Sequence, residues 1–133
     1  MERQFPSHGA ARLSGFTLIE LLVTMAIISL LLSLAVPRYF GSLDKAKDTV
    51  LRENLHQMRD AIDKFYGDQA RYPANLEELV IKRYLRNIPA DPITESAKTW
   101  RAVPPPEPQK GEVSDVKSGA PGNGRDGTAY ASW

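Results

Sequence analysis

The chain has 133 residues, which is enough for one domain of ordinary size. Its 17 Lys and Arg residues nearly balance 16 Asp and Glu residues, so no basic excess indicates nucleic-acid binding. The chain contains no Cys, which excludes disulfides, thiolate catalysis and Cys-ligated metal centres. Only two His are present, His8 and His56, and this argues against a His-rich metal or catalytic site.

The segment from Phe16 to Val36 is the most apolar part of the chain. Of its residues, 16 are apolar, four are Thr or Ser and one is acidic. A helix of this length spans roughly 31 Å, close to the ~30 Å hydrocarbon core of a bilayer. The alternative is a buried core helix, but a small chain has little with which to surround a helix that is apolar on every side. Residues 16–36 are therefore predicted to form a transmembrane helix, with the lipid bilayer as a partner.

Glu20 is the single charged residue of this span, and the span contains no Lys, Arg or His to pair with it. An ionised carboxylate in hydrocarbon is costly unless it is paired, so Glu20 is a candidate functional residue. If the chain were cut before Phe16, the new α-amine would lie four residues away on the same helical face. The alternative is a protonated Glu20 near the membrane interface.

The sequence Gly15-Phe16-Thr17-Leu18-Ile19-Glu20-Leu21-Leu22, followed by the apolar helix, resembles the class III signal of the type IV pilin-like superfamily. This resemblance implies that residues 1–15 are a leader peptide. A prepilin peptidase would cut it off after Gly15 and then N-methylate Phe16. It further implies that Glu20 guides filament assembly. The N-terminus would be cytoplasmic, and a head formed by residues 37–133 would be periplasmic, anchored in a bacterial inner membrane.

The segment after the span begins with Pro37, which lacks a backbone donor and predicts a break or kink in the helix. Beyond it, apolar residues recur at spacings of three, four and seven. This pattern predicts an amphipathic helix over about 38–66 that ends near Gly67. The charged residues, expected on its solvent face together with His56, include Asp44, Lys45, Lys47, Asp48, Arg52, Glu53 and Arg59.

The rest of the chain predicts short elements. Asn75 followed by Glu78 resembles a capping box and predicts a short helix to about Arg83. In a β and loop region over about 98–133, residues 99–103 and 112–117 are predicted strands, and residues 130–133 are expected to pack against them. The proline-rich residues 104–108 between the strands favour a stiff connector over a PxxP ligand.

A Gly-rich stretch follows the predicted strands. Residues 122–127 match G-x-G-x-x-G, but too few residues follow for the helix that a nucleotide site requires. The sequence therefore does not predict a nucleotide site there.

The soluble part extends the resemblance to the G-type, or major, pseudopilin of type II secretion. The matching segments are residues 71–73, 76–79, 84–89, 91–92, 115–119 and 126–133. The resemblance implies an α+β fold: a type IV pilin-like lollipop whose long N-terminal helix packs on a small antiparallel β-sheet. Type IV pilins often carry a C-terminal disulfide loop, which this Cys-free chain cannot form, and this favours the pseudopilin.

The same resemblance implies Ca²⁺ in a C-terminal loop. Asp126 fits one acidic ligand position, whereas Ala120-Pro121-Gly122 stands where another acid is expected. Asn123 as a neutral oxygen ligand and the Ser118 carbonyl are the remaining candidates. Fewer carboxylates imply weaker binding. The alternative is a metal-free Gly turn, and no other cofactor is expected.

These features predict a structural subunit and not an enzyme. By resemblance, it polymerises with itself into a helical periplasmic filament that drives type II protein secretion. Its other partners would be the prepilin peptidase, the inner-membrane assembly platform and minor pseudopilins. Two alternatives are a major or minor pilin of a type IV pilus, for adhesion or motility, and a non-polymerising membrane-anchored module that binds through residues 104–127.

Overall fold

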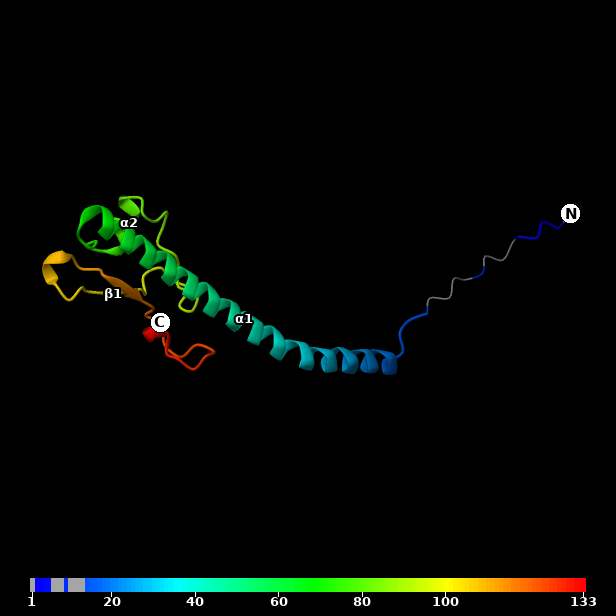
Figure 1. Ribbon diagram of the computed structural model, residues 1–133. Coiled ribbons are helices and arrows are strands. Elements are labelled where there is room, and N and C mark those ends of the chain that lie inside the picture. Colours follow the sequence, from blue (N-terminus) through cyan, green and yellow to red (C-terminus); the bar gives the residue numbers. More distant parts are fainter. Residues whose placement is uncertain (1, 6–8, 10–13) are drawn as a thin grey trace. The chain divides into compact units, whose positions relative to one another are not determined.

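The computed structural model describes residues 2–5, 9 and 14–133. Its elements follow in chain order, as Figure 1 shows: α1 (Leu18–Gln69), α2 (Leu76–Ile81), β1 (Arg101–Val103), the 3₁₀ helix η1 (Pro108–Lys110), β2 (Asp115–Lys117) and the 3₁₀ helix η2 (Tyr130–Ser132). One long helix combined with a two-stranded antiparallel sheet confirms the predicted α+β class.

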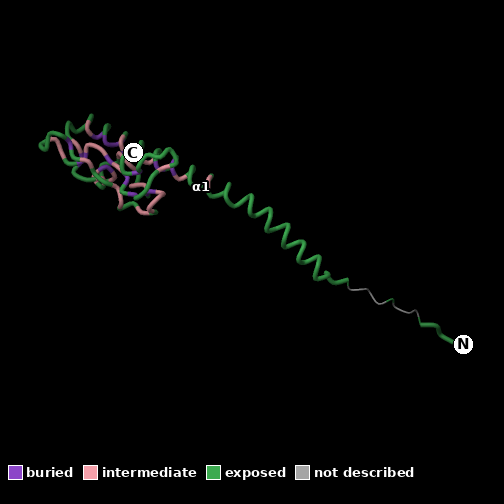
Figure 2. Tube along the Cα trace, turned by 90° about the horizontal axis from the view of Figure 1, so that it is seen from below, coloured by how far each residue is buried: buried purple, intermediate pink, exposed green. Residues whose placement is uncertain are grey.

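The chain divides into two compact units, one ending at Arg38 and the other running from Tyr39 to Trp133, which we call the head. In the first unit the only regular element among the described residues is the N-terminal part of α1. Every described residue of this unit is exposed to solvent, as the green tube in Figure 2 shows. Apolar side chains on all sides of a helix need a non-aqueous environment, which the unit does not supply from its own residues.

Pro37 does not break the helix, so the break, one of the two outcomes predicted there, is wrong. Residues Leu18–Gln69 form one α-helix with Pro37 inside it. A proline removes one backbone donor, which leaves the carbonyl of Ser33 without its usual intrahelical partner. Starting a new helix costs more than losing one bond within an existing one, because nucleation is unfavourable and propagation is cooperative. Apolar turns on both sides therefore keep α1 continuous through this position.

Within the head, α1 buries one stripe of side chains at alternating spacings of four and three. These residues are Leu51, Leu55, Met58, Ile62 and Phe65. The predicted amphipathic pattern is therefore confirmed. The helix ends at Gln69 rather than near Gly67, and the residue that leaves the helical conformation is Ala70, with φ of 55°. Helix ends are commonly misplaced by one or two residues when read from sequence.

The predicted capping box starts α2. Asn75 has extended backbone angles, and its side-chain oxygen accepts a hydrogen bond from the Glu78 backbone N–H at 2.9 Å. This bond satisfies one of the donors left free at a helix start. The helix closes at Ile81, two residues before the predicted end.

The two predicted strands are confirmed, although each is only three residues long. β1 and β2 pair antiparallel, with Arg101 opposite Lys117 and Val103 opposite Asp115. Val116 in the centre of β2 is fully buried and joins the α1 stripe in a single core. Residues 130–133 contact β2 as expected, but they form the 3₁₀ helix η2 and a terminal Trp133 rather than a strand.

Candidate functional site

The predicted cleavage junction lies just before α1. Gly15 has no atom within 4 Å of the place where a Cβ would stand, and the Phe16 side chain is 92% exposed. Nothing in this chain's own fold requires glycine at position 15. The predicted leader, residues 1–15, lies partly outside the described residues, namely at residues 1, 6–8 and 10–13.

Glu20 has a partner that the sequence analysis missed. Its carboxylate accepts a hydrogen bond from the Thr17 backbone N–H at 3.2 Å, and the Thr17 hydroxyl accepts one from the Glu20 backbone N–H at 3.2 Å. This reciprocal pair is a capping box at the start of α1, with Glu20 at the third helical position. The signal was visible in the sequence as Thr-x-x-Glu before an apolar run.

The other polar side chains of the predicted span are also satisfied locally. The hydroxyls of Thr24, Ser29 and Ser33 each donate to the backbone carbonyl four residues earlier, at 2.7–2.8 Å. In lipid, an unsatisfied polar group costs several kcal/mol, by order of magnitude. The best 18-residue window of α1 has a mean hydropathy of 2.5 and none of it is buried, so α1 is long and apolar enough to cross a membrane.

The C-terminal segment is anchored to α1 through Asp48, a buried acid that the sequence analysis expected on the solvent face. Asp48 accepts a hydrogen bond from the Tyr130 hydroxyl at 2.7 Å and another from the Arg125 backbone N–H at 2.9 Å. Burial, aided by the bond to Asp48, raises the pKa of Tyr130 to about 12. The Arg125 side chain also donates to the carbonyl of Gly41 at 2.8 Å.

Arg59 forms a second anchor, and it too was expected on the solvent face. Its guanidinium donates to the Asp115 carboxylate at 2.8 Å, to the Val116 carbonyl at 3.0 Å and to the Trp133 carbonyl at 2.7 Å. Three bonds from one planar guanidinium join α1 to β2 and to the chain end. Both anchors were missed because a charge on a helix surface does not reveal which distant segment will cover it.

The one acidic side chain expected to hold Ca²⁺ is already paired within the chain. One oxygen of Asp126 pairs with Arg52 at 2.8 Å, and the other accepts two bonds from Thr128. The Ser118 hydroxyl donates to buried Asp91 at 2.6 Å, and Asn123 lies in an isolated β-bridge with Ala129. Across residues 2–5, 9 and 14–133, no group of three or more His, Asp or Glu side chains could hold a metal ion.

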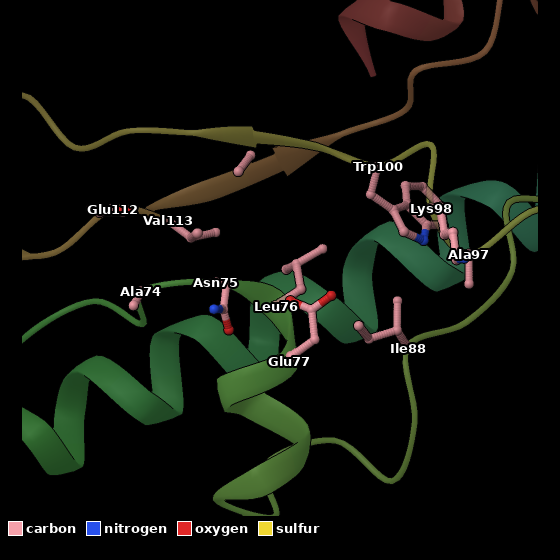
Figure 3. A pocket seen from close by; sticks show the side chains of 11 residues that line it. Ala74, Asn75, Leu76, Glu77, Ile88, Ala97, Lys98, Trp100, Glu112 and Val113 are labelled. Atoms are coloured by element: carbon pink, nitrogen blue, oxygen red, sulfur yellow. The ribbon is translucent and has the colours of Figure 1, made fainter.

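A surface pocket of about 330 Å³ lies between the start of α2 and the segments that lead into the two strands (Figure 3). Its charged lining residues are Glu77, Lys98 and Glu112, with the Trp100 ring on the side of β1. This lining contains no Ser, Thr, Cys or His. His56 is exposed on α1 and lines a different, smaller hollow beside Trp133.

Among the described residues, the structure defines a class of protein: one exposed apolar helix, an open glycine just before it and a small α+β head. Comparison with known proteins agrees with this class. Residues 11–36 match the family described as "Prokaryotic N-terminal methylation motif". No solved structure matches the chain significantly.

Curated relatives extend the match into the head. The chain is 35% identical over 95 residues to the type II secretion system core protein G of Pseudomonas aeruginosa, covering 59% of this chain and 67% of that protein. It is 32% identical over 97 residues to the protein of the same name from Aeromonas hydrophila (61% and 68%), and 32% over 94 residues to that of Escherichia coli K12 (59% and 65%). The chain belongs to the family of type II secretion system core protein G, the G-type pseudopilins.

Proposed function

We propose that this chain is processed after Gly15 and then polymerises with copies of itself into a helical periplasmic filament that drives type II secretion. As a pseudopilin it is a subunit of that system. The observation that carries the proposal is the junction itself. An open glycine and an exposed phenylalanine stand just before a capped helix, and the apolar part of that helix carries one acid, Glu20, in the first turn.

The capping box supports a specific role for Glu20. In the uncut chain its carboxylate is held by the Thr17 backbone N–H, so the acid is partnered before any neighbour arrives. Cutting after Gly15 creates a positive amine one residue before Thr17, and N-methylation keeps that charge. A charged amine attracts a carboxylate more strongly than a neutral N–H does. Glu20 can then pair with the amine of its own chain or of a neighbour, which sets the register of assembly.

The chain then acts as a structural subunit and not as an enzyme, with the prepilin peptidase as the enzyme that modifies it. The inner-membrane assembly platform and minor pseudopilins would be its further partners. The apolar helix anchors it in the inner membrane, with the N-terminus in the cytoplasm and the head in the periplasm. The type II secretion name of the relatives supports this system over a type IV pilus.

Intact-mass analysis of membrane-extracted protein tests the processing step. In a host that supplies a prepilin peptidase, we expect a chain that begins at Phe16 and carries one methyl group. Gly15→Leu should leave the precursor uncut, because the peptidase must admit the backbone there. Gly9→Leu is the matched control, since Gly9 is also an open glycine before α1. A wild-type chain that keeps Met1 would contradict the proposal.

Crosslinking of sheared filaments tests the assembly step. We expect Glu20→Val to remain in the membrane fraction, because Val suits hydrocarbon better than Glu, and to lower filament recovery at least about tenfold. Ser29→Val, a change within the same helix, should assemble normally. Parental filament levels for Glu20→Val would remove Glu20 as the register element. A parental chain that forms no filaments would instead favour the alternative of a non-polymerising module that binds through residues 104–127.

Orientation can be tested because the chain contains no Cys. Lys98→Cys places a single thiol on an exposed head residue. A membrane-impermeant maleimide should label it in cells whose outer membrane has been permeabilised. Labelling only after the inner membrane is broken would contradict a periplasmic head.

A further inference from the structure

The loop before the chain end is fastened to α1 by a positive charge that belongs to the chain itself. This loop, residues 118–129, is followed by η2 and Trp133. The Arg52 guanidinium donates to Asp126 at 2.8 Å, and its central carbon stands 3.8 Å from the centre of the Trp133 ring. One cation therefore holds a carboxylate and an aromatic ring at the same time.

A chain of short hydrogen bonds joins these two partners of Arg52 to each other. The Trp133 indole N–H donates to the Thr128 hydroxyl at 2.6 Å, and that hydroxyl donates to the second oxygen of Asp126 at 2.6 Å. The Thr128 backbone N–H donates to the same oxygen at 2.9 Å. These bonds, with Arg52 nearby, hold the pKa of Asp126 below its usual value. Each carboxylate oxygen of Asp126 therefore already has a hydrogen-bond partner within the chain.

The hydroxyl of Ser118 is also committed within the chain. Ser118 is fully buried and donates to Asp91, which is fully buried too. The Ala120 backbone N–H donates to the Ser118 hydroxyl at 3.1 Å, so this side chain stabilises its own turn. Pro121 offers no side-chain oxygen at the position where an acid was expected. The loop retains one acid, and that acid already faces a cation.

We propose that the Arg52 guanidinium takes in this chain the place that a metal cation would take, so that the C-terminal loop is locked to α1 without Ca²⁺. A loop held by an internal cation keeps its shape whatever the Ca²⁺ concentration around it. This inference concerns the stability of the head and stands whether or not the chain forms filaments.

The test uses the full-length protein in detergent micelles. Both Trp residues, Trp100 and Trp133, lie in the head, so tryptophan fluorescence reports its unfolding. We expect the melting temperature to be the same in 5 mM Ca²⁺ and in 5 mM EDTA, within about 1 °C. A metal bound at a hundredfold excess over its Kd would raise it by more than about 10 °C. A Ca²⁺-dependent rise of that kind, reversed by EDTA, would overturn the proposal.

Arg52→Gln removes the cation and keeps much of the side-chain length. We expect it to lower the melting temperature by about 4–8 °C through loss of the ion pair and the ring contact. Lys64→Gln is the matched control, because Lys64 is an exposed cation of α1 whose ion pair, with Asp60, lies within the helix. Equal effects of the two substitutions would overturn the proposal.

Trypsin provides a local measurement that does not require unfolding. Arg125 lies in the loop and is held by Gly41 and Asp48, so cleavage after it requires the loop to open. Cleavage should be several-fold faster in Arg52→Gln than in the parent or in Lys64→Gln, and EDTA should not change the parental rate. Asp126→Asn combined with Arg52→Gln should accelerate cleavage by less than the product of the two single effects, because both changes remove the same ion pair. Additive effects would show that the two residues act independently, and would overturn the pairing.

Discussion

The two halves of α1 use apolar residues in opposite ways. From Leu18 to Val36 the large apolar side chains stay exposed on every side of the helix. From Leu51 to Phe65 they lie in one stripe, and the rest of the head covers that stripe completely. Figure 2 shows the contrast as exposed residues in the first half and buried residues only in the second.

The polar groups follow the same division. In the first half each hydroxyl is satisfied within its own helix, by a carbonyl four residues earlier or by the capping box. In the second half Asp48 and Arg59 are bonded to residues more than fifty positions away in sequence. The apolar side chains of the first half therefore need a non-aqueous environment that their own unit does not supply. The second half is stabilised by the rest of the head.

The largest difference in head stability is expected between truncations of one leucine in each half of α1. Leu55 is 1% exposed and Leu31 is 60% exposed. Leu55→Ala should destabilise the head by about 2–5 kcal/mol, because it leaves a cavity in the core. Leu31→Ala should leave the head's melting temperature unchanged. Tryptophan fluorescence of both full-length variants in micelles measures this, and a comparable loss in Leu31→Ala would show that the halves are not independent.

The sequence predicted the features that depend on local pattern. The α1 stripe followed from spacing, the α2 start from Asn75 and Glu78, and the strand pair from β-rich segments around a proline-rich connector. The predicted break at Pro37 does not occur, because a single lost hydrogen bond does not outweigh the cooperativity of a long helix.

For the candidate site, the sequence predicted several residues but not the partners that they contact. Glu20 stood out as the one charge of the apolar span, and Gly15 and Phe16 through the family resemblance. The partner of Glu20 was overlooked, although Thr17 is only three residues away. The ion pair of Arg52 with Asp126 joins residues 74 positions apart, and no local pattern indicates such a contact. Expected metal ligands were therefore assigned without knowing that one already faced a guanidinium.

Removing one hydroxyl from the first half of α1 and one from the head compares a hydrogen bond within a helix with hydrogen bonds between segments of the head. Ser118→Ala leaves a buried oxygen of Asp91 and the Ala120 N–H without this partner, which should cost about 1–3 kcal/mol. Ser29→Ala removes a bond to a carbonyl of its own helix and should change the head's stability by less than about 0.5 kcal/mol. Denaturant melts of the two variants give the comparison, and equal values would refute it.

Alkaline pH should destabilise the head through Tyr130. Because its pKa is raised to about 12 in the folded head, the unfolded chain loses this proton first, near the ordinary value of 10. This contribution to stability is therefore fully present below pH 10 and is lost as the pH rises from 10 towards 12.

Tyr130→Phe should flatten that decline, while costing about 1–1.5 kcal/mol at pH 8 for the lost bond to Asp48. Melting temperatures between pH 8 and pH 11.5 test both effects. Tyr39→Phe, which removes an exposed phenol from α1, is the control and should follow the parental curve. If the melting temperature of Tyr130→Phe falls with pH as steeply as that of the parent, groups other than Tyr130 cause the loss of stability at high pH.

The smallest expected effect concerns the solvent face of α1 in the head. Gly67 lies inside the helix, exposed, and no atom lies within 4 Å of the place that a Cβ would occupy. Gly67→Ala should raise the free energy of unfolding by about 0.5–1 kcal/mol, because alanine loses less backbone entropy in a helix than glycine does. Gly119→Ala is the contrasting change, since its Cβ would collide with the Thr99 carbonyl, and it should destabilise the head. Chemical denaturation of both variants measures the two changes in the free energy of unfolding, which should have opposite signs. A destabilised Gly67→Ala would mean that this face of α1, exposed in the isolated subunit, carries a contact that its own head does not provide.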